Sequence, residues 1–333
     1  MYKKFYICFI LSLVSFNIYS NDTFYFIAGG NIVPAKENQT NVEMKEEIII
    51  LELLDDYYNV TVDFTFYNNG NDENLLVGFP YFLQKQGGTY STSIYDFRTW
   101  INNILIDHEN NKIEFNEAGE NEIMIDYIFT KNVFFPSNEI TKTRVNYKVK
   151  YGQVSPSYLI ASYLYGSGKP WLNTIGKMII IIKNNMTREL NWIYELNMEN
   201  IEPSKYAYWE NGAIKIQLEN IDPVDYNDLI EIYIGPPLWD IGPRVFMPER
   251  FRYRNSIIPI KAVKYFSKPQ LRLLRNLYYA FYGYNFNDEE LKSFYKNDMS
   301  SDWYEIKTDF TEDMITEIER ENIKIIMEEE KLR

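Results

Sequence analysis

Apolar and polar residues alternate one by one in several segments between residues 21 and 243. A period of two places alternate side chains on opposite faces of a strand, so the apolar set is expected on a buried face. The segments with this alternation are 60–66, 145–151, 214–219 and 230–234. Two further segments, 48–54 and 178–182, are apolar on both faces, which is typical of central strands.

Turn-forming residues separate these segments. Gly and Asn cluster at 68–72, 87–88, 166–168 and 211–212. The pair Asn211-Gly212 is the strongest hairpin signal, because both residues tolerate the positive φ of a type I′ turn. Many short strands with little helical periodicity predict a mainly β region over residues 21–243, an antiparallel β-sandwich or two stacked ones.

The pattern becomes helical near the C-terminal end. Ser267 and Gln270 form a capping-box pair at a helix start. Apolar residues then recur at helical spacing, and Gly283 is placed to end this helix with a positive φ. Asn287 is expected to start a second helix and Thr311 to cap a third. Residues 263–333 are therefore predicted to form a small three-helix domain.

Residues 244–262 form a basic connector between these two regions. From 244 to 275 the chain has nine Lys or Arg and one acidic residue, Glu249, a net charge of +8. From 276 to 333 it has fifteen acidic and seven basic residues, a net charge of −8. The basic stretch is expected either to pack against its acidic neighbour or to face an anionic envelope polymer. The residues of such a ligand face would be Arg250, Arg252, Arg254, Lys261 and Lys264.

The first twenty residues have the pattern of a secretory signal peptide. Lys3 and Lys4 precede an apolar run over 5–16, and Ser20 stands at the expected cleavage point. The run is shorter than the roughly 20 apolar residues that span a bilayer, so no membrane span is expected after cleavage. Cys8, the single cysteine, lies inside this run, and the mature chain would form no disulfide. An exported protein of the bacterial periplasm or cell surface is predicted.

The sequence carries no recognisable catalytic set. His108 is the single histidine, in a polar stretch expected to be a solvated turn, so zinc sites of the usual kinds and Ser-His-Asp triads are excluded. We expect no metal, cofactor or catalytic residue. Because the net charge is −13, nucleic acid is not an expected partner. Aromatic residues that either stack on sugars or fill the core are Tyr57, Tyr58, Trp171, Trp209 and Trp239.

The C-terminal region resembles the YARHG module, a small helical domain of bacterial exported proteins, over residues 266–330. The matching positions are Arg275, Asn276, Tyr279, Ala280, Gly283 and Phe286, followed by Trp303, Tyr304 and the segment 318–323. Phe281 and Tyr282 replace the Arg and His of the name motif. The resemblance implies export and a mainly structural role for these residues, and no established activity. Arg275 and Asn276 are expected to bond loop carbonyls near Trp303, while Trp303 and Tyr304 fill the helical core.

The N-terminal part is more distantly similar to other exported bacterial β-domains, through residues 44–47, 79–81 and 165–171. The whole sequence predicts an exported, non-catalytic envelope protein that binds a cell-wall polymer or another envelope protein. Two alternatives stay open. One is an envelope hydrolase that uses paired carboxylates, and the other is a structural subunit of a surface assembly.

Overall fold

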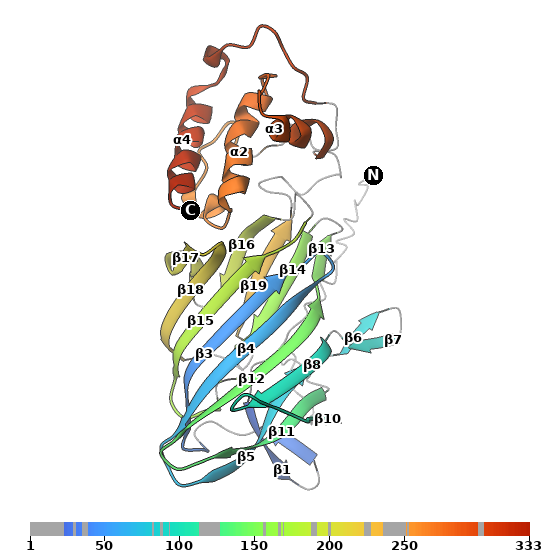
Figure 1. The fold of residues 1–333 in the computed structure, drawn as a ribbon, viewed down its shortest axis with the longest axis vertical. Helices are drawn as coiled ribbons and strands as arrows, with labels where there is room; N and C mark the ends of the chain where they lie inside the picture. The colour runs from blue at the N-terminus through green and yellow to red at the C-terminus, as the bar shows by residue number, and fades with distance from the viewer. Residues whose placement is uncertain are drawn as a thin grey trace, which may run out of the picture.

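The computed structural model confirms a mainly β protein with a helical C-terminal domain (Figure 1). The helical domain is stacked on one end of the strands. The structure describes residues 23–28, 31–34, 39–81, 83–86, 89–92, 94–112, 127–155, 158–165, 168, 170–187, 192–198, 201–222, 228–235, 251, 253–298 and 303–333. The predicted signal peptide lies outside these residues. In the described part, no helix combines the length and apolarity required to cross a bilayer.

The largest layer is an eight-stranded sheet. Its strands, in spatial order, are β17 (Ala207–Glu210), β18 (Ala213–Ile221), β15 (Ile175–Asn184), β3 (Val42–Leu53), β4 (Tyr57–Asn68), β12 (Ile140–Lys150), β8 (Ile94–Ile101) and β9 (Ile104–Ile106). All neighbours are antiparallel except β3 and β15, which are parallel. The two segments apolar on both faces are these two strands, at the centre of the sheet.

Two smaller sheets pack against this layer. One contains β10 (Glu109–Lys112), β11 (Tyr127–Phe135), β5 (Glu73–Tyr81), β1 (Thr23–Ala28) and β2 (Asn31–Pro34). The other contains β13 (Gly152–Ser155), β14 (Tyr158–Leu164), β19 (Leu229–Gly235) and β16 (Trp192–Met198), and a separate hairpin pairs β6 (Leu83–Gln86) with β7 (Thr89–Thr92).

Side chains join the smaller sheets to the same face of the large one. The rings of Phe66 on β4 and Phe135 on β11 have centroids 5.6 Å apart. The hydroxyl of Tyr58 on β4 donates to the carbonyl of Ser162 on β14 at 3.1 Å. One apolar cluster runs through all three sheets, so the region is a single long layer covered by two shorter ones.

The predicted alternation matches the observed burial. Along β4 every second residue is buried, and the intervening residues are half-buried. The turn between β17 and β18 has φ of 51° at Asn211 and 75° at Gly212, as expected for a type I′ hairpin. The opposite face of the large sheet carries cross-strand ion pairs such as Arg144 with Asp63.

The C-terminal domain contains α1 (Ile260–Val263), α2 (Lys268–Ala280), α3 (Glu289–Ser293) and α4 (Glu317–Lys331). A π-helical turn (Phe294–Asp298) continues α3. Both bonds of the predicted capping box between Ser267 and Gln270 are present at the start of α2. Gly283 follows this helix with φ 76°, and an added Cβ would lie 2.5 Å from the carbonyl oxygen of Glu305.

Two predicted helix starts are shifted. Asp288, not Asn287, caps α3, because its carboxylate accepts from the backbone N–H of Leu291. Thr316, not Thr311, caps the long helix α4, where it forms a reciprocal capping box with Glu319. Thr311 precedes only a short 3₁₀ turn (Glu312–Met314) and makes no side-chain cap. The connector adds a fourth, short helix, α1.

Candidate functional site

The β region and the helical domain exchange aromatic side chains at their contact. Trp192 of β16 packs in the helical core, with its ring 4.9 Å from that of Phe266. Tyr265, next to Phe266, packs in the core of the β region. Each part therefore fills a gap in the other, which fixes their relative position at this contact.

Polar contacts around Lys264 strengthen the same contact. The carbonyl of Lys264 accepts from the indole N–H of Trp209 at 3.0 Å and from the Arg333 guanidinium at 2.8 Å. The ammonium group of Lys264 donates to the Ser204 carbonyl. The Arg333 guanidinium also lies 5.4 Å from the centre of the Trp209 ring. Lys264, predicted on a ligand face, thus contributes to the contact between the two parts.

A cavity of about 490 Å³ lies at this contact. Its volume is within the range of roughly 300–1,000 Å³ that is usual for small-molecule sites. The β region contributes the end of β15, the start of β16 and the β17–β18 hairpin, and the helical domain contributes the starts of α2 and α3. The described lining residues are Asn184, Met186, Thr187, Trp192, Trp209, Gly212, Tyr265, Ser267, Pro269, Gln270, Leu273, Glu290, Ser293 and Phe294.

Tyr265 is the most informative polar residue of the lining. The residue is 5% exposed, and its hydroxyl makes no hydrogen bond within the described part of the chain. By contrast, the hydroxyl of Thr187 donates to Asp55, and that of Ser267 accepts from the Gln270 N–H. Burial, with the nearby carboxylates of Glu202 and Glu195, raises the pKa of Tyr265. The hydroxyl therefore stays protonated at neutral pH.

The charge of the lining is largely compensated. Among the described lining residues, Glu290 is the charged one, and its carboxylate lies 2.9 Å from the Arg272 guanidinium. Arg272 also pairs with Asp288, the cap of α3. The remaining lining side chains described by the structure are aromatic, apolar, amide or hydroxyl groups, so the described part of the wall is amphipathic and mostly neutral.

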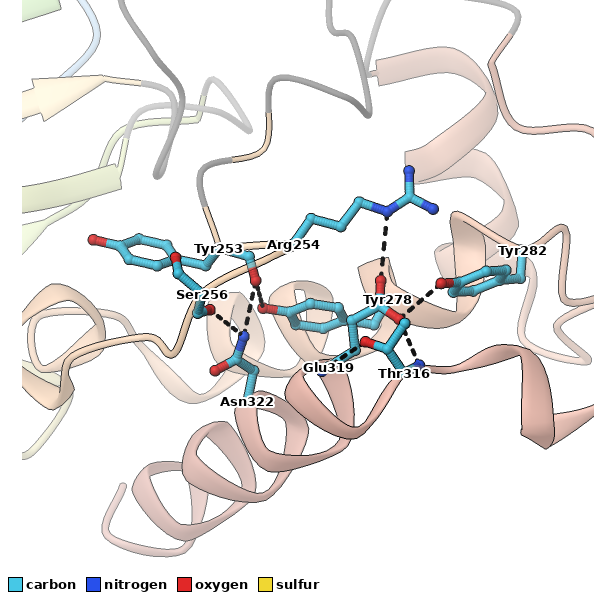
Figure 2. Close-up of polar contacts among 8 residues, drawn as sticks. All are labelled: Tyr253, Arg254, Ser256, Tyr278, Tyr282, Thr316, Glu319 and Asn322. Carbon is cyan, nitrogen blue, oxygen red and sulfur yellow. Dashed lines mark hydrogen bonds and ion pairs between the residues drawn. The ribbon is translucent and has the colours of Figure 1, made fainter.

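A buried polar network lies inside the helical domain (Figure 2). The fully buried carboxylate of Glu319 accepts from the Tyr282 hydroxyl at 2.8 Å, from the Thr316 N–H at 2.9 Å and from Arg254 at 3.4 Å. The Arg254 guanidinium also lies 4.9 Å from the centre of the Phe281 ring. Tyr282 and Phe281 stand where the module has His and Arg, so in this chain both positions stabilise the fold.

Asn322 holds the connector to α4. Its amide donates to the carbonyls of Tyr253 and Ser256 at 2.8 and 2.9 Å (Figure 2). Its oxygen accepts from the Ile258 N–H at 2.8 Å. Phe251, Ile258 and Val263 of this stretch lie in the helical core. The connector between residues 251 and 263 is thus packed as part of the helical domain.

The other motif residues are mainly internal to the domain. Arg275 pairs with Glu330 at 3.1 Å, and the Asn276 amide donates to the Arg272 carbonyl at 2.8 Å. These two partners lie on α4 and α2. Within the described residues, Arg275 and Asn276 therefore do not bond the loop carbonyls near Trp303, contrary to the prediction from sequence. The remaining members lie in or against the aromatic helical core, and these are Tyr279, Ala280, Phe286, Trp303 and Tyr304.

Of the other four residues of the predicted ligand face, the structure describes Arg254 and Lys261. Lys261 on α1 is exposed, whereas Arg254 is committed to Glu319. Arg250 and Arg252 lie outside the described residues. Among the described residues of this face, Lys261 is therefore the one whose charge is exposed to solvent.

His108 differs from the expected solvated turn. Its ring packs 5.0 Å from Phe97 and 5.1 Å from Phe129 in edge contacts. Burial lowers its pKa, and Lys131 acts in the same direction, while Asp107 opposes them. These ring contacts could not be predicted from the sequence around His108, because Phe97 and Phe129 lie on two other strands, β8 and β11.

The predicted aromatic candidates separate into two groups. Tyr58 and Trp171 are fully buried in the β core, where they cannot stack on a ligand. Trp209 lines the cavity, Tyr57 is half-buried on β4, and Trp239 lies outside the described residues. Sequence reasoning missed Trp192 and Tyr265, because nothing local in the chain indicates that they cross between the two parts.

Among the described lining residues, carboxylates do not converge, because Glu290 is the single acidic one. On the four-stranded sheet, burial raises the pKa of Glu231, and the nearby carboxylate of Glu195 raises it further, while a hydrogen bond from Tyr233 opposes both. Neither Glu231 nor Glu195 lines the cavity. Within the described residues, no cluster of three or more His, Cys, Asp or Glu side chains is placed to hold a metal ion.

A family model described as the YARHG domain matches residues 245–331. A solved Legionella pneumophila structure, described as a "putative nutrient binding protein", is similar over 94% of this chain and 98% of its own, with a TM-score of 0.51 and 15% identity. That similarity concerns the fold alone. An M1 zinc metallopeptidase from Deinococcus radiodurans aligns over 72% of this chain and 53% of its own at 10% identity, with a TM-score of 0.31, too low to indicate a shared fold.

The search of curated proteins gave no match. The YARHG match begins at residue 245, which agrees with the packing of the connector residues in the helical core. The buried network around Glu319 and the contacts of Arg275, Gly283 and Tyr304 give a structural account of the motif positions. Residues 245–331 of this chain are a YARHG domain.

Proposed function

We propose that this chain is an exported, non-catalytic binding protein of the bacterial envelope, and that its ligand enters the cavity between the β region and the YARHG domain. The observation that carries the proposal is the joint lining of this cavity, which includes Tyr265, a residue whose hydroxyl makes no hydrogen bond among the described residues. Ligand sites are commonly found where two domains meet. A binding role also agrees with the description of the Legionella protein.

The ligand we propose belongs to the envelope itself, as a cell-wall polymer or a segment of another envelope protein. The end of a polymer chain is small enough to enter a cavity of this size, whereas a folded domain is too large. YARHG domains are typical of exported proteins, and the pattern of residues 1–20 supports export.

The test is retention of the purified mature protein, residues 21–333, by insoluble cell-wall sacculi. Pro269 is exposed and lines the cavity, so Pro269→Trp should fill the cavity with little effect on the fold. The matched control is Lys268→Trp, one residue away, exposed and outside the lining. We expect retention by the wild type and the control, and at least tenfold weaker retention by Pro269→Trp.

Salt separates this proposal from binding through basic residues. Because the described lining is mostly neutral, retention should change little between low and high salt. If retention falls steeply with salt and is unchanged in Pro269→Trp, the ligand would instead bind to exposed cations such as Lys261. Absence of retention for every variant would leave a protein partner as the better hypothesis.

The same incubation tests the hydrolase alternative, which the raised pKa of Glu231 favours. A non-catalytic protein releases no soluble fragments from sacculi. Fragment release that disappears in Glu231→Gln would refute the non-catalytic proposal.

A further inference from the structure

We propose that the ligand of the inter-domain cavity is an uncharged saccharide, bound as a short oligosaccharide or as the end of a glycan chain. This inference rests on the proposed function, because it names the chemical class that the same cavity takes. It assigns Tyr265 and Gln270 as hydrogen-bonding residues for the sugar.

The mixture of groups in the wall matches the two sides of a sugar ring. Trp192, Trp209 and Phe294 provide aromatic surface, and Leu273 adds an aliphatic side chain. A pyranose ring offers C–H groups to such surfaces, while its edge carries hydroxyls. Amide and hydroxyl side chains in the same wall can pair with those hydroxyls.

Two polar groups of the wall are available for such pairing. Tyr265 is 5% exposed, and its protonated hydroxyl makes no hydrogen bond among the described residues. Gln270 uses its side-chain oxygen to accept from the Ser267 N–H at 2.9 Å, which leaves its amide N–H groups as donors. A ligand oxygen can therefore accept a hydrogen bond from each of these two side chains.

Charge argues against other small polar ligands. Free amino acids, peptides and phosphorylated compounds require a partner of opposite charge when they are desolvated. Among the described lining residues the charged side chain is Glu290, which Arg272 already neutralises. An uncharged, hydroxyl-rich ligand is the class that the described part of this wall satisfies without an unpaired charge.

Titration calorimetry on the mature protein tests this inference. The probes are two neutral sugars, the N-acetylglucosamine trimer and maltotriose, and two compounds with charged groups, the cationic glucosamine trimer and zwitterionic trialanine. We expect at least one neutral trimer to bind, and both charged probes to bind at least tenfold more weakly. Equal or tighter binding of either charged probe would overturn the inference.

Tyr265→Phe removes the hydroxyl and nothing else, so it tests the assigned role. We expect about a tenfold loss of affinity for the neutral trimer, equal to about 1.4 kcal/mol. The melting temperature of the unliganded variant should not fall, because the lost group has no partner in the described protein. Tyr95→Phe, an exposed tyrosine on β8, is the control and should bind like the wild type. Unchanged affinity in Tyr265→Phe would refute the assignment.

Competition distinguishes a wrong ligand class from a wrong function. If Pro269→Trp abolishes retention by sacculi and no neutral sugar binds or competes, the cavity binds another ligand and the saccharide inference fails alone. If neutral sugars bind Pro269→Trp as well as they bind the wild type, both the cavity site and its saccharide are refuted.

Discussion

At the scale of single residues, the buried polar groups of the YARHG domain show how its motif works as a framework. Asn322 is fully buried and makes three hydrogen bonds to the backbone of residues 253–258. Residues 253–258 form no helix or strand, so their backbone groups need other partners, and the buried side chain of Asn322 supplies three of these hydrogen bonds. Asn is suited to this place because it offers both donors and an acceptor.

Asn322→Asp keeps the shape of this side chain and removes its donors. The carboxylate would face the carbonyls of Tyr253 and Ser256, so we expect the free energy of unfolding to fall by roughly 2–4 kcal/mol. Urea unfolding of the mature protein measures this loss. Asn285→Asp, an exposed position in the same domain, is the control, with an expected change of about 0.5 kcal/mol or less. Equal effects of the two changes would show that Asn322 does not hold the connector.

The lowered pKa of His108 predicts a pH dependence of stability. Because the folded state disfavours the proton, the unfolded state binds it first as pH falls below the ordinary value of 6.5. This residue therefore costs no stability above about pH 6.5 and an increasing amount as pH falls toward the folded pKa. His108→Phe should lose less stability between pH 7 and pH 5 than the wild type does, measured by urea unfolding at each pH. Parallel profiles would contradict this assignment.

At the scale of elements, local signals explain which predictions succeeded. The period of two in β4 and the Asn211-Gly212 turn depend on neighbours in sequence, and both were correct. The parallel pairing of β3 with β15 joins two strands that are far apart in the sequence, so it could not be predicted from a local pattern. The cavity could not be predicted from the sequence for the same reason, because its two walls come from segments that meet only in the folded chain.

The two candidate caps of the long helix give a direct test at this scale. Thr316 accepts from the Glu319 N–H and receives the Glu319 side chain in return, while Thr311 makes no side-chain cap. We expect Thr316→Ala to lower the free energy of unfolding by about 1 kcal/mol, and Thr311→Ala to change it by a few tenths at most. Thermal unfolding followed by circular dichroism provides the comparison. A larger loss for Thr311→Ala would return the cap to the position predicted from sequence.

At the scale of the whole molecule, the exchange of aromatic rings determines whether the two parts behave as one. Trp192 contributes to the helical core and Tyr265 to the β core, and the contacts of Lys264 lie between them. Such reciprocal packing ties the stability of each part to the other. A cavity at the same contact gains a fixed shape, which binding without large rearrangement requires.

Trp192→Ala tests this coupling. Removing a buried Trp typically costs about 3–5 kcal/mol, and here the lost contacts join the helical core to the β region. We expect one calorimetric transition in the wild type and two in Trp192→Ala, with the helical domain unfolding first. Trp171→Ala, which removes a fully buried Trp from the β core alone, should lower stability without creating an earlier transition of the helices.

Because the cavity needs both walls, ligand binding should be lost in Trp192→Ala at temperatures where the β region is still folded. A single transition in Trp192→Ala would mean that other contacts, such as those of Arg333 and Trp209, are enough to hold the two parts together.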